Sequence, residues 1–529
     1  MKSIICLQFI SALTASLILQ PLGSQEEKKV PVELRLSKEN AVKLAVENHF
    51  SVKAAQAGKD ISDRNWIVEQ AVFDPYLTLG ATYGKDRRPT ASFLDIGPAG
   101  LEPGISANPT KNSTIFGTIG GRTTLGTQYA LTLYDSMYDR PLAYGSIYGL
   151  NPQDEMTASL EITQPLLKGA WYPYNSARLR IASNNKRLAA HELEQVVTDL
   201  VYEVESTYWL LSFSRKNFEA KSKGQATATE NLEKITQAQA AGTRSQVDVV
   251  TASSQLSLRK VELIEAQILL NNARDKLLLY LSDPKGESLL DRWKRGEPGT
   301  QFDQINVTPI TQTNEKKYSP ERARSLDLAF SHRGDYRQMK TIVENKAIEL
   351  KVADNELLPQ LDLKAGWSQH GLGGDIGGAY DTLRGREFYS WSIGLELQVP
   401  LSSRGPRNRY LRVQDELRQI NFQRSQLEND IVVEVDQVIR NLQLQHQMIQ
   451  DLEKRVQLQT QLLKTENDKL EAGRSVYYNV SVIENDLVES QAHALKARGD
   501  YQAMKTAYLR TTGTLLITYG YDFEAPPDP

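Results

Sequence analysis

Two long stretches of helical periodicity, each ending at a glycine turn, constrain the fold more than any other feature. From about Ser176, apolar residues recur at steps of three and four, and no proline interrupts them. The turn at residues 241–245 ends this stretch, and a second periodic segment continues to about Leu281. Gly242 suits a reversal because glycine tolerates the left-handed conformation that ends a helix. A helix of about 65 residues is a rod of roughly 98 Å, too long for an ordinary globular domain.

The same arrangement recurs later in the chain. A second glycine turn, residues 472–475, follows the first after 231 residues, and the helical pattern at 37–73 corresponds to 321–357 at an offset of 284. In each half the order is helix, strand, strand, long helix, glycine turn and returning helix. Matched order is the signature of duplication. We therefore predict two repeats, 37–282 and 320–516, joined by an equatorial linker at 283–319 and followed by a tail at 517–529.

Each predicted repeat contains two segments in which apolar and polar residues alternate. They are residues 75–84 and 157–164 in the first repeat, and 361–368 and 391–399 in the second. Between the first two, residues 85–155 are rich in Gly, Pro, Asn, Ser and Tyr, and we expect a long loop insertion with an extended piece near 123–134. These residues add either further strands or only loops. The smallest barrels have about eight strands, so four strands per chain require oligomerisation to enclose a lumen.

The first 24 residues have the features of a secretory signal. Lys2 precedes an apolar core from Ile4 to Leu19, and small residues follow at Gly23 and Ser24. The single cysteine, Cys6, lies inside this segment, so the mature protein is expected to lack thiols and disulfides. No later window is apolar enough for a membrane-spanning helix, so an exported chain of this kind enters a membrane only as a closed barrel.

The two faces of the predicted strands differ in chemistry. Charged residues on the polar faces are expected to line water in a barrel lumen: Glu161, Asp362, Lys364 and Glu396. The apolar faces carry Tyr83, Trp367 and Trp391 near their ends, as an aromatic girdle in contact with outer-membrane lipid does. The alternative is a soluble β-sandwich that buries one face of each sheet.

Enzymatic chemistry finds no support in the sequence. There is no phosphate-binding loop, no His-Glu-x-x-His and no Gly-x-Ser-x-Gly. The six histidines lack metal-ligand spacing, and we expect neither a metal site nor a cofactor. The net charge of −3 gives no basic field for nucleic acid. The protein is therefore expected not to be an enzyme.

In these motifs the chain resembles the TolC-like outer-membrane efflux proteins, also called outer membrane factors. The specific parts are the first glycine turn with the start of its outgoing helix (residues 241–252), Asp74-Pro75 and Leu358-Pro359 before strands, and Gln164-Pro165 after one. The resemblance implies a mainly α protein with a β-barrel: a homotrimer in which twelve strands form an outer-membrane barrel. Twelve helices continue that barrel as a hollow cylinder through the periplasm, with a mixed belt near mid-length.

The resemblance also implies a gate and partners. The helical tips would close the periplasmic end and open when a periplasmic adaptor and an inner-membrane transporter engage. Tip residues that would meet the adaptor are Gly242, Thr243, Arg244, Ser245, Gly473, Arg474 and Ser475. Asp248 matches the family's pore-constricting carboxylate, with Asn479 as its neutral equivalent; the next positions inward are Thr251 and Val482. A solvated helix carboxylate is the alternative for Asp248.

The sequence thus favours an exit duct for a tripartite efflux pump or a type I secretion system. Drugs, metal ions and polypeptides all remain open as cargo. The first alternative is an exported structural or adhesive coiled-coil rod, which should show uninterrupted heptads and no duplicated strand pairs. The second is a family member that has lost transport.

Overall fold

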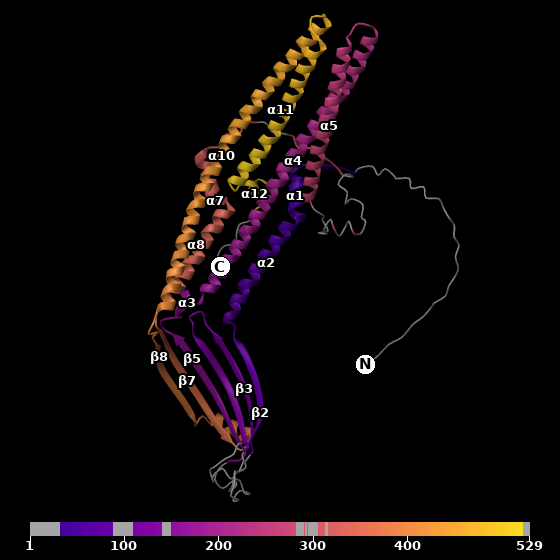
Figure 1. Cartoon of the computed structure of the whole chain (residues 1–529). Helices are drawn as coiled ribbons and strands as arrows, with labels where there is room; N and C mark the ends of the chain where they lie inside the picture. Colours follow the sequence, from indigo (N-terminus) through magenta and orange to yellow (C-terminus); the bar gives the residue numbers. More distant parts are fainter. Residues whose placement is uncertain are drawn as a thin grey trace, which may run out of the picture.

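The computed structural model describes residues 32–87, 109–139, 150–281, 290, 294, 305–312 and 316–521. A six-stranded sheet occupies one end of the molecule, and two helical hairpins make their turns at the other end (Figure 1). The predicted signal peptide with Cys6, much of the predicted linker and the last eight residues of the tail lie outside the described residues.

Two long helices extend from the sheet to the tips. They are α4 (Ala177–Ala240, 64 residues) and α10 (Arg404–Glu471, 68 residues). Beside α4 lie α2 (Phe50–Gln70) near the sheet and α5 (Gln246–Leu281) near the tips. Beside α10 lie α8 (Gly334–Asn355) and α11 (Tyr477–Thr511) in the same order. In each half of the chain, one long helix thus packs against two shorter helices placed end to end.

The group of α4, α2 and α5 is joined to the group of α10, α8 and α11 in one layer, through contacts of α8 and α11 with α4. The order across the layer is α10–α8–α4–α2 near the sheet and α10–α11–α4–α5 near the tips. The stripe that holds α4 in this layer is the one expected from its periodicity, because Val197, Val201, Val204, Tyr208 and Leu211 are all fully buried. Both near the sheet and near the tips, the chain thus contributes four neighbouring helices.

The first helix of each predicted repeat is interrupted once, which the periodicity did not indicate. The first is divided at His49 into α1 (Lys38–Asn48) and α2, and the other at Arg333 into α7 (Arg322–His332) and α8. Both residues are extended, with ψ of 134° and 125°. They lie 284 positions apart, the offset that relates the predicted repeats. This equivalence supports the predicted duplication.

The sheet corrects the prediction of four strands per chain. Its order is β2 (Tyr76–Arg87), β3 (Pro109–Arg122), β4 (Gln128–Asp139), β5 (Gln153–Pro165), β7 (Gln360–Gly373) and β8 (Tyr389–Gln398), with all neighbours antiparallel. The extra pair, β3 and β4, comes from the predicted loop insertion. The piece expected near 123–134 contains the turn of this hairpin and the first half of β4. The sheet is open, with β2 and β8 at its edges.

Three short helices flank the sheet. The 3₁₀-helix η1 (Ala71–Phe73) precedes β2, and α3 (Trp171–Asn175) follows β5 at the junction with α4. At the far end, α9 (Ile376–Gly385) packs on β5 and β7 and buries Met156 beneath Ala379 and Leu383. The structure leaves no room for a side chain at Gly371, where a Cβ atom would lie 2.1 Å from the carbonyl oxygen of Ala379.

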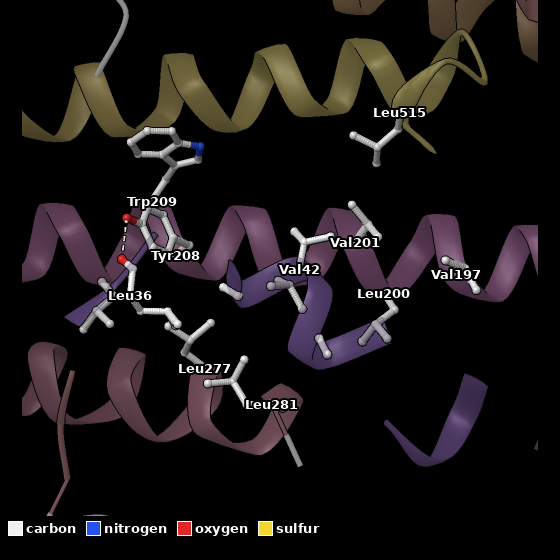
Figure 2. Close-up of a cluster of buried hydrophobic side chains, with 14 of the residues drawn as sticks. Leu36, Val42, Val197, Leu200, Val201, Tyr208, Trp209, Leu277, Leu281 and Leu515 are labelled. Atoms are coloured by element: carbon white, nitrogen blue, oxygen red, sulfur yellow. Dashed lines mark hydrogen bonds between the residues drawn. The ribbon is translucent and has the colours of Figure 1, made fainter. Parts of the chain in front are cut away.

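The largest hydrophobic core lies along α4, where chain segments far apart in sequence meet. Strands β1 (Val32–Leu36) and β6 (Ile305–Pro309) pair in parallel there, and α12 (Leu515–Thr518) packs against the same core. Figure 2 shows Leu36 beside Tyr208, with Val42, Leu277 and Leu515 farther along the same core. The linker and the C-terminal segment were predicted to build a belt of this kind, and β6 and α12 come from them; the contribution of β1 was not predicted.

The hydroxyl of Tyr208 is the polar centre of this core. It donates to the carbonyl oxygen of Leu36 at 3.1 Å and accepts from the amide of Thr311 at 3.0 Å. Tyr501 does the same in the second half of the chain: it donates to the carbonyl oxygen of Lys316 and accepts from the amide of Tyr318. Tyr208 therefore ties two crossing segments, the end of β1 and the stretch after β6, to α4, and Tyr501 ties one segment, residues 316–318, to α11.

We predict that Tyr208→Phe destabilises the protein by about 1–3 kcal/mol, because it leaves the part-buried amide of Thr311 without its partner and removes one of the two hydrogen bonds that the Leu36 carbonyl accepts, while keeping the ring. Urea unfolding of the purified protein in detergent, followed by circular dichroism, measures the change. Tyr478→Phe is the control, since Tyr478 is 62% exposed. Equal midpoints for both variants would contradict the assigned role.

Candidate functional site: helical tips and sheet faces

The two tips end their incoming helices in the same way. Gly242 and Gly473 have positive φ angles of 75° and 66°. The amide of Gly242 donates to Gln239 and that of Thr243 to Ala238, both at 2.9 Å; Gly473 and Arg474 repeat the pattern with Leu470 and Lys469. These are the two bonds of a Schellman motif, which needs the left-handed residue that glycine supplies. The predicted reversals therefore occur at both predicted glycines.

Asp248 caps the helix that leaves the first tip. Its carboxylate accepts from the amide of Ser245 at 3.1 Å and from the Ser245 hydroxyl at 3.0 Å, and the Asp248 amide donates back to that hydroxyl at 3.2 Å. This reciprocal arrangement is a capping box, with aspartate in the position usually held by glutamate. The carboxylate also lies at a helix N-terminus, where negative charge is favoured. Asp248 therefore has a structural task apart from any role in a pore.

The second tip is built differently beyond its glycine. Asn479 donates from its side-chain nitrogen to the Ser475 hydroxyl at 3.3 Å, and that hydroxyl donates to Glu466 of the incoming helix. Lys469 forms an ion pair with the same glutamate at 3.1 Å. Together the Ser475 and Lys469 hydrogen bonds hold the pKa of Glu466 below its ordinary value. The carboxylate here belongs to α10 and not to the outgoing helix.

The remaining predicted residues lie on the surface of the tips. Thr251 binds its own helix through its hydroxyl, which donates to the Val247 carbonyl at 2.8 Å. Val482 is 41% exposed on α11. Arg244 is half-buried and Arg474 is exposed. The structure thus gathers the tip residues and the predicted gate residues at one end of the molecule and leaves them accessible.

A contact between the two hairpins, which sequence reasoning missed, holds the tips together. Arg259 of α5 is only 4% exposed, and it donates to Glu262 at 2.8 Å and to Asn485 of α11 at 2.6 Å. Nearer the turns, Tyr477 packs against Ile235 and other apolar residues of the first hairpin. Arg259 occupies a stripe of buried residues seven apart, with Ala252, Ala266 and Ala273. This seven-residue spacing is the sequence signal that could have indicated a buried position for Arg259.

The carboxyl groups around Arg259 feel opposite influences. Burial raises the pKa of Glu484, and the positive charge of Arg259 opposes that rise. The pKa of Glu262 is lowered: burial acts to raise it, but Arg259 and Lys221 together outweigh that effect. Arg259 is therefore the cation that compensates acidic groups on both sides of the seam between α5 and α11.

At the opposite end, the predicted lumen residues share one face of the sheet. Asp362 lies opposite Glu396 in the register, and Lys364 forms an ion pair with Glu396. Glu161 belongs to the adjoining strand, across from Gly366. All four lie in the halves of β5, β7 and β8 nearest the helices. The polar face therefore carries most of its charge at the junction with the helices.

The other face of the sheet is apolar from edge to edge. Leu79 is 74% exposed on β2, and Leu395 is 67% exposed on β8. Between them the register aligns Leu160, Trp367 and Trp391 across three strands. An exposed apolar face of this extent requires an apolar environment or a partner.

Among the described residues there is neither a membrane-spanning helix nor a metal-binding cluster. No helix in this part of the chain is both long and apolar enough to cross a membrane. Among these residues, no three His, Cys, Asp or Glu side chains are grouped so that they could hold a metal ion.

Comparison with known proteins places this geometry. Residues 41–282 match the family model of the outer membrane efflux protein. Residues 41–282, a little under half of the chain, are thus similar to the outer membrane efflux proteins. This similarity supports an outer-membrane efflux channel. No curated protein matches the chain significantly.

Solved structures extend the likeness to the second half of the chain. The outer membrane protein VceC of Vibrio cholerae is 15% identical with a TM-score of 0.63, over 90% of this chain and 96% of that one. The CmeC channel of Campylobacter jejuni is 12% identical with a TM-score of 0.59, over 90% and 86%. The open-state MtrE channel of Neisseria gonorrhoeae is 12% identical with a TM-score of 0.58, over 90% and 89%. At such identities these structures establish a shared fold.

Proposed function

We propose that this protein is the exit duct of a tripartite pump or a type I secretion system. It works as a homotrimer whose sheets close into an outer-membrane barrel and whose helices continue as a tube through the periplasm. A periplasmic adaptor and an inner-membrane transporter open the duct at its helical tips.

The main support for this proposal is that the described sheet has two open edges, one on each side of the chain. Among the described strands, β2 and β8 each pair on one side only. A strand edge leaves backbone groups unpaired, which lipid does not tolerate. Because β2 and β8 lie on opposite sides of the chain (Figure 1), one copy's β2 can pair with the next copy's β8. Repeated contacts between unlike surfaces generate a ring when the rotation closes.

On the same two sides of the chain, helices α5 and α10 carry exposed apolar stripes that fit the same ring. On α5, apolar residues at coiled-coil spacing are each more than half exposed: Val247, Val250, Val261, Ile264 and Ile268. On α10, on the other side of the layer, the exposed apolar residues include Phe422, Val433, Leu444, Leu458 and Leu462. Two stripes that face away from their own chain support contact with neighbouring copies.

The tips supply the mechanism. The α10–α11 hairpin can move away from α4–α5 only if the Arg259 and Tyr477 contacts break. An adaptor that binds the exposed residues of the turns, from Gly242 to Ser245 and from Gly473 to Ser475, is placed to stabilise that separated state. Asp248 on α5 supplies the carboxylate of the constriction, so that three copies form a ring with affinity for cations.

Stoichiometry and conductance test the whole proposal. Native mass spectrometry of the detergent-solubilised protein should give a trimer, and the trimer should form steady conducting steps in a planar bilayer. A monomer that stays in solution without detergent would overturn the proposal. Trimers that never conduct, even when Arg259 or Asp248 is replaced, would favour the alternative of an exported rod.

We predict that Arg259→Ala raises the conductance of the resting channel severalfold, because Glu484 and Glu262 lose their compensating charge and the seam between the hairpins weakens. Single-channel recording measures this. Lys260→Ala is the matched control, because Lys260 is the exposed neighbour on the same helix. Unchanged conductance in a correctly assembled Arg259→Ala trimer would remove the contact from the gate.

Asp248 requires a pair of substitutions that separates charge from capping. Asp248→Asn removes the charge but keeps an oxygen that can accept from Ser245, whereas Asp248→Ala removes both. We predict that both variants lose block by divalent cations added on the periplasmic side, with an increase of about tenfold or more in the blocking concentration. If only Asp248→Ala changes the block, the residue acts as a helix cap and not as a ring of charge.

A further inference from the structure

The β3–β4 hairpin is a full part of the sheet wall. All twelve residues of β2 are registered against β3, from Tyr76 opposite Gly120 to Arg87 opposite Pro109. On the other side, β4 is registered against β5 from Gln128 to Tyr138. The hairpin therefore separates β2 from β5 along their whole length, and it cannot leave the sheet without breaking two ladders.

Both faces of the hairpin continue the faces of its neighbours. On the apolar face, Ile119 lies between Leu77 and Leu131, and Leu131 lies next to Leu160. On the polar face, Thr118 is paired with Thr132, and their hydroxyls are hydrogen-bonded at 3.0 Å. A wall between lipid and water needs this alternation on every strand. Strands β3 and β4 have it.

Three aromatic side chains fix the register of the hairpin by covering glycines on the adjoining strand. A Cβ atom at Gly80 would lie 2.4 Å from the ring of Phe116, and one at Gly120 would lie 2.6 Å from the Tyr76 hydroxyl. A Cβ atom at Gly121 would lie 2.6 Å from the Tyr129 hydroxyl. Aromatic residues over glycines are a known device for holding a curved sheet in register. Two of these contacts hold β3 against β2, and the third holds β3 against β4 within the hairpin.

We propose that β3 and β4 widen the outer-membrane barrel of the assembled protein from twelve strands to eighteen, so that its exit is as wide as the helical tube. This inference rests on the proposed trimer, to which each chain brings the six strands observed. Strands about 4.8 Å apart and tilted by about 40° give a backbone diameter of about 36 Å for eighteen strands and about 24 Å for twelve.

The helical part allows the two widths to be compared. Each chain contributes four helices at every level. Twelve helices whose axes lie about 9 Å apart form a ring of about 34 Å in diameter. Eighteen strands therefore continue the tube without a step, and the narrowest part of the duct is at the tips. The exit therefore admits any cargo that fits through the helical tube.

Deleting the hairpin tests the inference. In the variant lacking residues 109–139, β2 and β5 become antiparallel neighbours, because three antiparallel pairings now separate them. Both ends of the deletion lie at the end of the sheet away from the helices, so residues 88–108 and 140–152 can connect the two strands. Electron microscopy of native and deleted protein, viewed along the long axis, measures the width of the barrel end. We expect the native barrel to be about 1.5-fold wider, in the ratio of the strand numbers.

The outcomes separate this inference from the proposed function. A native protein that is not a trimer defeats the assembly on which both rest. A trimer whose barrel has the same width with and without the hairpin leaves the duct intact and overturns the inference. Should the deleted variant fail to fold, the native protein decides alone: its barrel should equal the helical tube in width, and a barrel two-thirds as wide would overturn the inference.

A matched pair of glycine substitutions tests the lock itself. Gly121→Val should displace the Tyr129 ring and cause loss of the eighteen-stranded barrel, seen as loss of trimer at the temperature where native protein stays assembled. Gly224→Val on α4 is the control, because nothing lies within 4 Å of a Cβ atom there and α4 has neighbours of the same chain on both sides. Equal loss in both variants, or none in Gly121→Val, would show that the hairpin does not hold the wall.

Discussion

The structure depends on one constraint: helices as long as α4 and α10 have no core of their own and are stable only side by side. The chain meets this need by stacking two shorter helices along each long one and joining the pairs through α4. The arrangement leaves the outer flanks of α5 and α10 with apolar residues and nothing from the same chain to cover them. The same incompleteness appears at the sheet edges. Assembly is therefore a requirement that follows from the shape of each chain.

Contacts between residues distant in sequence hold the crossing segments of the belt against the helices. Tyr208 and Tyr501 occur in different halves of the chain, yet each holds a crossing strand or loop to a buried position on a helix. The breaks at His49 and Arg333 allow the first helix of each half to turn where this belt begins. The two breaks occupy equivalent positions in the two halves, and they support duplication more strongly than residue identity does, because each is a shared local conformation.

Local patterns in the sequence predicted the long helices, both reversals and the outer strands, since each depends on spacing within a few residues. The sequence left open whether residues 85–155 add strands or loops, because several glycines take the place of larger side chains in β3, and the rings that cover them, such as Tyr76, come from neighbouring strands. Strand β1 was missed because its partner β6 lies about 270 residues away in the chain. At the tips, the position of Asp248 was predicted but its capping bond was not. Arg259 was missed because, in the sequence alone, a charged residue among alanines at this spacing looks like an ordinary solvent-exposed position.

The unlike construction of the two turns has a consequence for anything that grips this end of the molecule. In the proposed ring of three copies, six turns alternate between two kinds: one has a carboxylate at the start of its outgoing helix, and the other has an amide there. A partner with three identical arms can choose one kind and ignore the other. A partner with six identical arms must tolerate both chemistries, and its arms then divide into two classes of unequal strength.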